Sequence, residues 1–178
     1  MQPKRRNELE RSLAGVRLLA LDVDGTLTDG GVTFVGDQEL QRFNVHDGQG
    51  LVWLRREGLE LAWISGRGSE ATRRRATELG VSELHLNSGD KAAVLADIQA
   101  RLGIDVNATL AMGDDIPDLA LASRAGVFAC PADARPEVQA RADVVTTARG
   151  GEGAVRELCE ALLRARGRLA VYCGETLA

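Results

Sequence analysis

The chain has 178 residues, of which 44% are hydrophobic and 27% charged, and its formal net charge is −4. This length favours one domain over residues 1–178, and the hydrophobic content excludes a disordered chain. The acidic balance argues against a nucleic-acid partner, aromatic residues at 3% argue against base stacking, and no apolar run approaches the roughly 20 residues that cross a bilayer.

The start of the chain and its cysteines bear on location. Residues 1–17 are largely polar and charged, and the apolar run Val16–Leu21 is too short for a signal-peptide core. Cys130, Cys159 and Cys173 are odd in number and widely spaced, which suits neither a disulfide framework nor a zinc site. We therefore expect reduced thiols, a cytoplasmic location and no membrane partner.

Short apolar runs alternate with helical segments along the chain. The first run, Leu18–Leu21, is continuous, as in a strand buried on both faces. Val32–Val35 and Leu40–Asn44, with Gly36-Asp37 as the turn, predict a β-hairpin over about 32–44. Further strands are expected at 61–64, 84–86, 109–112, 127–130 and 143–146, and helices at 48–57, 69–79, 90–102, 115–123, 135–140 and 153–166. This alternation predicts an α/β fold with a Rossmann-like, doubly wound parallel sheet and a hairpin insert.

Two carboxylates and a glycine follow the first strand directly, in the run Asp22-Val-Asp24-Gly25-Thr. In an open α/β sheet, ligands bind beyond the carboxyl ends of the strands. Asp22 and Asp24 are too close for both to be ionised without a cation, so a hard divalent ion, Mg²⁺, is expected. Gly25 allows the backbone to approach a phosphate. The alternative interpretation of this run is a plain Asp/Gly turn.

This run resembles the first motif of the haloacid dehalogenase superfamily, Asp-x-Asp-x-Thr/Val. The resemblance implies that Asp22 is a nucleophile that attacks a phosphate ester and becomes phosphorylated. It further implies that Asp24 protonates the leaving alcohol and then activates water, while Mg²⁺ neutralises charge on the transferring group.

Two further superfamily motifs occur in the expected order. Ser65 follows the strand at 61–64 and would hydrogen-bond the phosphate, and Lys91 lies at the start of the helix at 90–102 and would offset phosphate charge. Taken singly, the serine fits a plain turn and the lysine a solvated surface residue. Their positions at a strand end and a helix start favour the superfamily.

The last motif is acidic and follows the strand at 109–112. By the resemblance, Asp114 would bind Mg²⁺ together with Asp22 and Asp24. Asp115 and Asp118 would orient metal-bound water or the motif lysine. For Asp115 and Asp118, an acidic helix N-terminus is the alternative.

The spacing of the motifs leaves no room for a large cap. The segments from Asp24 to Ser65 and from Lys91 to Asp114 are each too short for a domain-sized insert. An open site in one subunit would admit water, so a neighbouring subunit is expected to cover it, with the hairpin at 32–44 as the association element.

Four longer runs resemble the family of 3-deoxy-D-manno-octulosonate 8-phosphate phosphatases: Asp22–Gly30, Phe43–Gly48, Ile64–Arg67 and Gly150–Glu157. The resemblance implies hydrolysis of that sugar-acid phosphate for lipopolysaccharide synthesis by a homotetramer. It also implies that Asn44, Asp47 and Gly48 line the substrate site, and that Arg67 and Arg75 bind the sugar carboxylate or the phosphate.

The sequence also departs from this family. His46 and Val52 replace arginines that are typical there, and the tail 174–178 ends differently. These departures leave a sialic-acid-type (nonulosonate) 9-phosphate, or another small phosphate ester, as alternative substrates.

Two rival functions remain open at this point. A non-catalytic assembly module of a nucleotide-sugar pathway is one, although a degenerate copy should have lost Asp22 or Asp24. A phosphotransferase is the other, although it would need a cap to keep water from the phosphorylated intermediate. A P-type pump is excluded by the lack of membrane spans and by the presence of Asp24.

Overall fold

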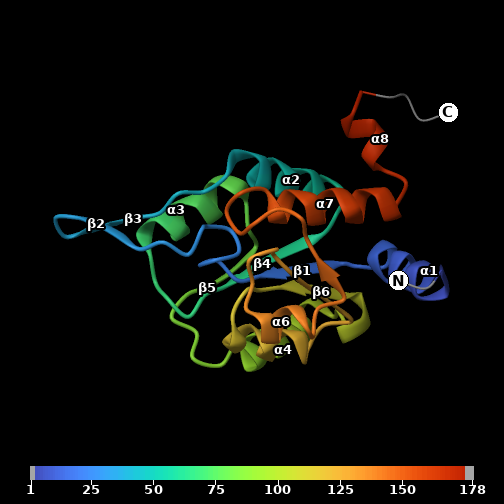
Figure 1. Ribbon diagram of the computed structural model, residues 1–178, viewed down its shortest axis with the longest axis horizontal. Helices are drawn as coiled ribbons and strands as arrows, with labels where there is room; N and C mark the ends of the chain where they lie inside the picture. Colours follow the sequence, from blue (N-terminus) through green and yellow to red (C-terminus); the bar gives the residue numbers. More distant parts are fainter. Residues whose placement is uncertain (1–2, 175–178) are drawn as a thin grey trace.

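The computed structural model describes residues 3–174. Its centre is a six-stranded sheet in the order β5-β4-β1-β6-β7-β8, in which every strand pairs in parallel with its neighbours (Figure 1). The strands are β1 (Leu18–Leu21), β4 (Glu60–Ile64), β5 (Glu83–His85), β6 (Thr109–Met112), β7 (Val127–Cys130) and β8 (Val144–Val145). The predicted Rossmann-like parallel sheet is confirmed.

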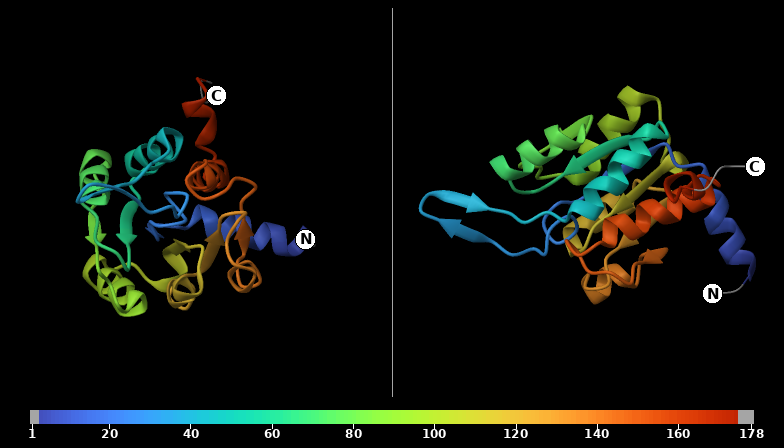
Figure 2. Two further views of the ribbon diagram at one scale, coloured as in Figure 1. Left: turned by 60° about the vertical axis from the view of Figure 1, so that its left-hand side comes forward. Right: turned by 90° about the horizontal axis from the view of Figure 1, so that it is seen from above.

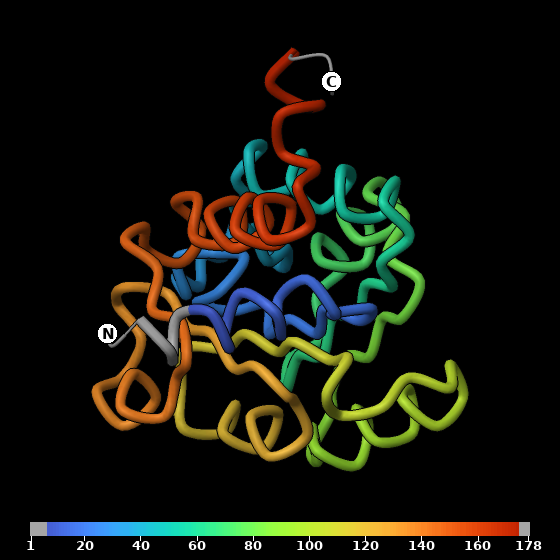
Figure 3. Tube along the Cα trace, turned by 90° about the vertical axis from the view of Figure 1, so that its right-hand side faces the viewer, coloured from blue at the N-terminus to red at the C-terminus, as the bar shows by residue number. Residues whose placement is uncertain are grey.

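Helices cover both faces of this sheet. In Figure 1, α2 (Val45–Arg56), α3 (Glu70–Leu79) and α7 (Ala154–Ala165) lie above it, and α4 (Lys91–Leu102) and α6 (Pro136–Gln139) lie below. The remaining helical segments are α1 (Pro3–Ala14), α5 (Leu119–Ala122), α8 (Leu169–Tyr172) and the 3-10 turns η1 (Val106–Ala108) and η2 (Ile116–Asp118). The end-on view of Figure 3 shows the same three layers, with the strands between α7 and α4.

Strand β1 is apolar throughout because it lies between two hydrophobic cores. Leu19 and Leu21 belong to the core beneath α2 and α7, whereas Leu18 and Ala20 belong to the core against α4. All four residues are fully buried. Each leucine contributes roughly 1.5–3 kcal/mol by leaving water, so both faces of the strand select for apolar side chains.

The ends of α3 and α4 agree with the helices predicted at 69–79 and 90–102, and side chains and glycines cap them. The Ser69 side chain accepts a hydrogen bond from the Ala71 N–H at the start of α3, and Asp90 does the same for Ala93 in α4. Gly80 and Gly103 end these two helices in the left-handed conformation. Helix α2 begins at Val45, three residues before the prediction.

Four further segments differ from the prediction. The predicted helix at 115–123 is divided into η2 and α5, and the second hairpin strand is Gln38–Leu40, not 40–44. Helix α1 was not predicted because its sequence is mostly polar, and it packs on α7. Helix α8 was not predicted either; its Tyr172 ring stacks on Trp53, with 4.8 Å between ring centroids.

The hairpin of β2 (Thr33–Val35) and β3 (Gln38–Leu40) extends away from the sheet at the end opposite α1 (Figure 2). Its large apolar side chains, Val32, Phe34, Val35 and Leu40, are exposed. Residues 3–174 contain no large cap domain, as predicted, and no helix within them is long and apolar enough to cross a membrane. The tail at 174–178, where the sequence departs from the family, lies outside the described part of the chain except for Gly174.

The strand order places the site. From β1 the chain winds outward through β4 and β5, then returns to β6 on the other side of β1 and winds outward through β7 and β8. The carboxyl ends of β1 and β6 therefore form the switch point at which α/β sheets bind ligands. Leu21 pairs with Met112, and the Asp22 N–H donates to the Met112 carbonyl at 2.9 Å, so the two acidic motifs emerge side by side.

Candidate active site

Asp22 and Lys91 meet in a buried ion pair. The Lys91 ammonium lies 2.6 Å from Asp22 Oδ1 and 2.5 Å from Asp118 Oδ1. All three side chains are at most 10% exposed. Lys91 is the first residue of α4, where the helix dipole disfavours a cation, so the two carboxylates must offset both that dipole and the loss of water.

Asp114 approaches this ion pair from the end of β6. Its Oδ1 accepts a hydrogen bond from the Thr26 hydroxyl at 3.2 Å. Gly25, at a φ of 97°, lies so close that a Cβ there would be 2.2 Å from Asp114 Oδ2. Only glycine fits at this position, because any side chain would displace the carboxylate.

Asp118 organises the loop that follows β6. Its Oδ2 accepts from the backbone N–H groups of Asp114 and Asp115 at 3.0 and 3.1 Å, while its Oδ1 holds Lys91. The exposed Asp115 side chain accepts from the Ile116 N–H at 2.8 Å. Asp118 thus contacts Lys91 directly, whereas the Asp115 side chain bonds within its own turn.

The electrostatics of this cluster are unbalanced. Burial raises the pKa of Asp22 well above its ordinary value and the Asp118 charge raises it further, while Lys91 lowers it. Burial, and then Asp118, raises the pKa of Asp114 to about 6. Burial alone would lower the pKa of Lys91, but Asp22 and Asp118 raise it above its ordinary value. Three carboxylates therefore share one ammonium group, and a further cation would neutralise the excess negative charge of the cluster.

These residues fit a divalent cation. Oxygen atoms of Asp22, Asp114 and Asp118 all lie within 4.8 Å of one another. Both oxygens of Asp118 already accept hydrogen bonds, whereas Asp22 and Asp114 each keep an oxygen without one among the contacts of the described residues. Asp22 and Asp114 are thus the two side chains suited to hold Mg²⁺, which prefers carboxylate oxygens.

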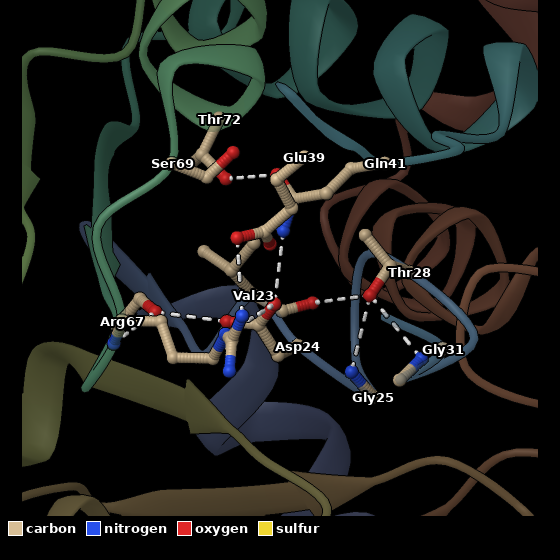
Figure 4. Close-up of polar contacts among 12 residues, drawn as sticks. Val23, Asp24, Gly25, Thr28, Gly31, Glu39, Gln41, Arg67, Ser69 and Thr72 are labelled. Atoms are coloured by element: carbon tan, nitrogen blue, oxygen red, sulfur yellow. Dashed lines mark hydrogen bonds and ion pairs between the residues drawn. The ribbon is translucent and has the colours of Figure 1, made fainter. Parts of the chain in front are cut away.

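The Asp24 carboxylate accepts hydrogen bonds from groups outside that cluster. Its Oδ1 accepts from the Gln41 side-chain amide (Figure 4) and its Oδ2 from the Ser65 hydroxyl, both at 2.9 Å. Among the described residues, Asp24 is not one of the carboxylates that lie within 4.8 Å of one another, so its role in metal binding stays a prediction. Ser65 itself is buried at the end of β4, beside the Arg67 N–H that donates to its hydroxyl at 3.0 Å.

The acidic cluster and Lys91 lie in the wall of one cavity of about 550 Å³. The residues that line it come from the ends of β1, β4 and β6 and from the start of α4, and they include Asp22, Asp24, Arg67, Lys91, Asp114, Asp115 and Asp118. The acidic residues at the ends of β1 and β6 and the lysine at the start of α4 therefore share one cavity. Arg67 is 47% exposed and forms an ion pair with Glu39 of the hairpin at 3.1 Å.

Four predicted substrate residues lie elsewhere. The Asn44 side chain accepts from the His46 N–H and caps α2, and Asp47 Oδ1 accepts from the Arg156 N–H at 2.7 Å. Burial raises the pKa of Asp47, while backbone hydrogen bonds lower it. Gly48 packs against Arg75, which pairs with Glu78 at 2.9 Å. None of these four is among the residues lining the 550 Å³ cavity, so their substrate roles stay predictions.

Two residues near the site were missed in the sequence. Gln41 follows β3, and its amide lies between Asp24 and Thr72 of α3, whose hydroxyl donates to Gln41 Oε1 at 2.6 Å. A glutamine on a hairpin and a threonine on a helix carry no motif. Only the return of the chain over the sheet brings them to Asp24.

Comparisons with known proteins agree with this geometry. A profile of the haloacid dehalogenase-like hydrolases matches residues 71–158. The 3-deoxy-D-manno-octulosonate 8-phosphate phosphatase of Escherichia coli (strain K12) is 37% identical over 164 residues, which span 91% of this chain and 87% of that protein.

Solved structures agree as well. The phosphatase of the same name from Moraxella catarrhalis, in complex with magnesium, phosphate and KDO, superposes with a TM-score of 0.91 at 37% identity, over 94% of this chain and 97% of that one. The cobalt-bound form from Haemophilus influenzae gives a TM-score of 0.88 at 33% identity, over 90% and 95%. Sequence, fold and site together show that the chain belongs to the 3-deoxy-D-manno-octulosonate 8-phosphate phosphatase family of haloacid dehalogenase-like hydrolases.

Proposed function

We propose that the chain is a magnesium-dependent phosphatase that hydrolyses 3-deoxy-D-manno-octulosonate 8-phosphate to the free sugar acid and phosphate. The observation that supports this most directly is the Lys91–Asp22 ion pair, in one cavity with Asp24 and Asp114. An attacking carboxylate, a proton donor and a place for a cation are the parts that transfer of a phosphoryl group requires.

The first chemical step forms a phosphorylated enzyme. Lys91 holds Asp22 Oδ1 and orients the carboxylate, so that its other oxygen attacks phosphorus in line with the ester bond. As the P–O bond to the sugar breaks, Asp24 gives its proton to the leaving oxygen. Asp22 and Asp114 would hold magnesium, whose positive charge would stabilise the phosphoryl oxygens.

The second step returns the enzyme to its starting state. Asp24, now a carboxylate, accepts a proton from water as that water attacks phosphorus. The bond between phosphorus and Asp22 breaks, and phosphate leaves. Ser65, whose hydroxyl donates to Asp24 and accepts from the Arg67 N–H, would bind a phosphoryl oxygen in these steps.

The substrate assignment is supported by the relatives and by the charge of the cavity mouth. The Moraxella catarrhalis protein binds the KDO product, a sugar acid. Arg67 is half-exposed beside the cavity and offers a forked cation to such a carboxylate. Val52, one of the departures from the family, is partly buried and packs on the core beneath α2, and His46 is exposed at the start of α2.

Phosphate release from purified protein with Mg²⁺ tests the assignment. We expect 3-deoxy-D-manno-octulosonate 8-phosphate to have the highest kcat/KM in a panel that includes nonulosonate 9-phosphates and 4-nitrophenyl phosphate. A higher kcat/KM for a nonulosonate 9-phosphate would identify that ester as the substrate and leave the proposed phosphatase mechanism unchanged. If the protein hydrolysed none of these esters, a non-catalytic assembly module would be the favoured function. Transfer of phosphate from one position of the sugar to another would identify a phosphotransferase.

We further propose that the enzyme is a cytoplasmic homotetramer in which neighbouring subunits cover the cavity. The exposed side chains of Phe34 and Val35, at 66% and 61%, support the hairpin as the contact. Light scattering should give four times the chain mass for the wild type. Phe34→Asp should yield smaller species, and an unchanged tetramer would exclude this contact.

A further inference from the structure

Asp24 is held at both ends of its carboxylate by groups from different parts of the fold. Ser65, at the end of β4, donates to Oδ2, and Gln41, just after β3, donates to Oδ1, each at 2.9 Å. The Asp24 side chain is 24% exposed, and Arg67 Nε lies 4.0 Å from Oδ1. The two hydrogen bonds are shorter than this ion-pair contact and therefore do more to set where the side chain points.

The direction of the Gln41 amide is set by its second partner and by charge. The Thr72 hydroxyl donates to Gln41 Oε1 at 2.6 Å, and Thr72 is 2% exposed (Figure 4). If the amide were reversed, Oε1 would face the Asp24 carboxylate, and two acceptors would repel each other. Only one orientation satisfies both neighbours.

We infer that Gln41 is a positioning residue that holds Asp24 in the direction needed for proton transfer, with Thr72 fixing the Gln41 amide. This inference rests on the proposed function, because it assigns Gln41 a task in that reaction. The hairpin would thereby contribute to catalysis, because Gln41 lies directly after β3. The Glu39–Arg67 ion pair connects the same strand to a residue that lines the cavity.

The leaving group offers a way to see this role. A sugar alkoxide needs a proton as it departs, whereas 4-nitrophenolate departs without one. The ratio kcat/KM covers only the steps up to release of the leaving group. A misdirected Asp24 should therefore lower kcat/KM for the sugar phosphate and spare the activated ester.

The experiment measures kcat/KM for 3-deoxy-D-manno-octulosonate 8-phosphate and for 4-nitrophenyl phosphate in Gln41→Met, which keeps the length and removes the donor. We expect a loss on the order of tenfold for the sugar phosphate and less than about threefold for the activated ester. Gln38→Met, the same change at an exposed position of β3, should alter neither value.

Thr72 gives an independent pair of variants. Thr72→Val removes the hydroxyl at nearly constant volume and should lower the sugar-phosphate value selectively, while Thr72→Ser should retain it. An equal loss for both esters in Gln41→Met, or no loss, would overturn the inference. If the wild type hydrolysed neither ester, the proposed function itself would fail, and that result is separate from any effect of Gln41.

Discussion

Two sides of the same cavity are built differently. On one side, Asp22, Lys91 and Asp118 form an ion-pair cluster that is at most 10% exposed and is held by strand ends and by the start of α4. On the other side, Arg67 forms an ion pair with Glu39 of the hairpin, and these two side chains are 47% and 21% exposed. Similar ion pairs should thus have very different energetic importance, because water screens the second pair and not the first.

The largest effect is expected for the nucleophile. Asp22→Asn keeps an oxygen that accepts from Lys91 but removes the attacking carboxylate, so kcat should fall by on the order of 10⁴-fold or more. Thermal denaturation and circular dichroism should report an intact fold. Asp29→Asn, the same change in an exposed ion pair with Arg42, should leave kcat unaltered. Residual activity within tenfold of the wild type would refute the role of Asp22.

The buried ion pair gives the next largest effect. Lys91→Met leaves Asp22 and Asp118 buried without a cation, and the free energy of unfolding without magnesium should fall by about 3–5 kcal/mol. Urea denaturation measures this change. Adding Asp118→Asn to Lys91→Met should recover part of the loss, because one uncompensated charge disappears. A loss below about 1 kcal/mol would show that water reaches the cluster.

Magnesium binding should depend on pH through Asp114. Its pKa is raised to about 6 from an ordinary value of 3.8, while the metal binds the ionised form. The dissociation constant for Mg²⁺ should therefore rise about tenfold between about pH 7 and about pH 5. Calorimetric titration at these values tests this, and a constant affinity would contradict it.

As pH rises, the same raised pKa makes the metal-free protein less stable, whereas magnesium binding becomes stronger. A raised pKa in the folded state means that Asp114 contributes stability at low pH, and that this contribution is lost as pH rises from about 4 through about 6. Asp114→Asn is the matched control, because its stability should lack this part of the pH dependence.

The smallest effect is expected on the exposed side. Arg67→Met breaks the ion pair with Glu39, yet the free energy of unfolding should change by less than about 1 kcal/mol. Urea denaturation beside Lys91→Met makes the comparison direct. If both variants lost equal stability, the contrast between the two sides of the cavity would be wrong.

Much of the fold was readable from local sequence. The continuous apolar strands reflect burial on both faces. The bounds of α3 and α4 were close to the predicted ranges because the caps at Ser69, Asp90, Gly80 and Gly103 each act within one turn of their helix. The N-terminal helix was missed because its sequence is mostly polar and it packs through α7. The second hairpin strand was placed too late, because alternation alone did not define where pairing stops.

The sequence by itself determined the parallel sheet and the motif residues at its strand ends, because parallel strands bring their carboxyl ends to one edge whatever lies between them. Only the tertiary structure decided that Asp118 holds Lys91, that Asp24 turns toward Gln41 and that Arg75 lies against Gly48. Those contacts join segments far apart in the chain, and their directions depend on packing and hydrogen bonding that no local pattern records.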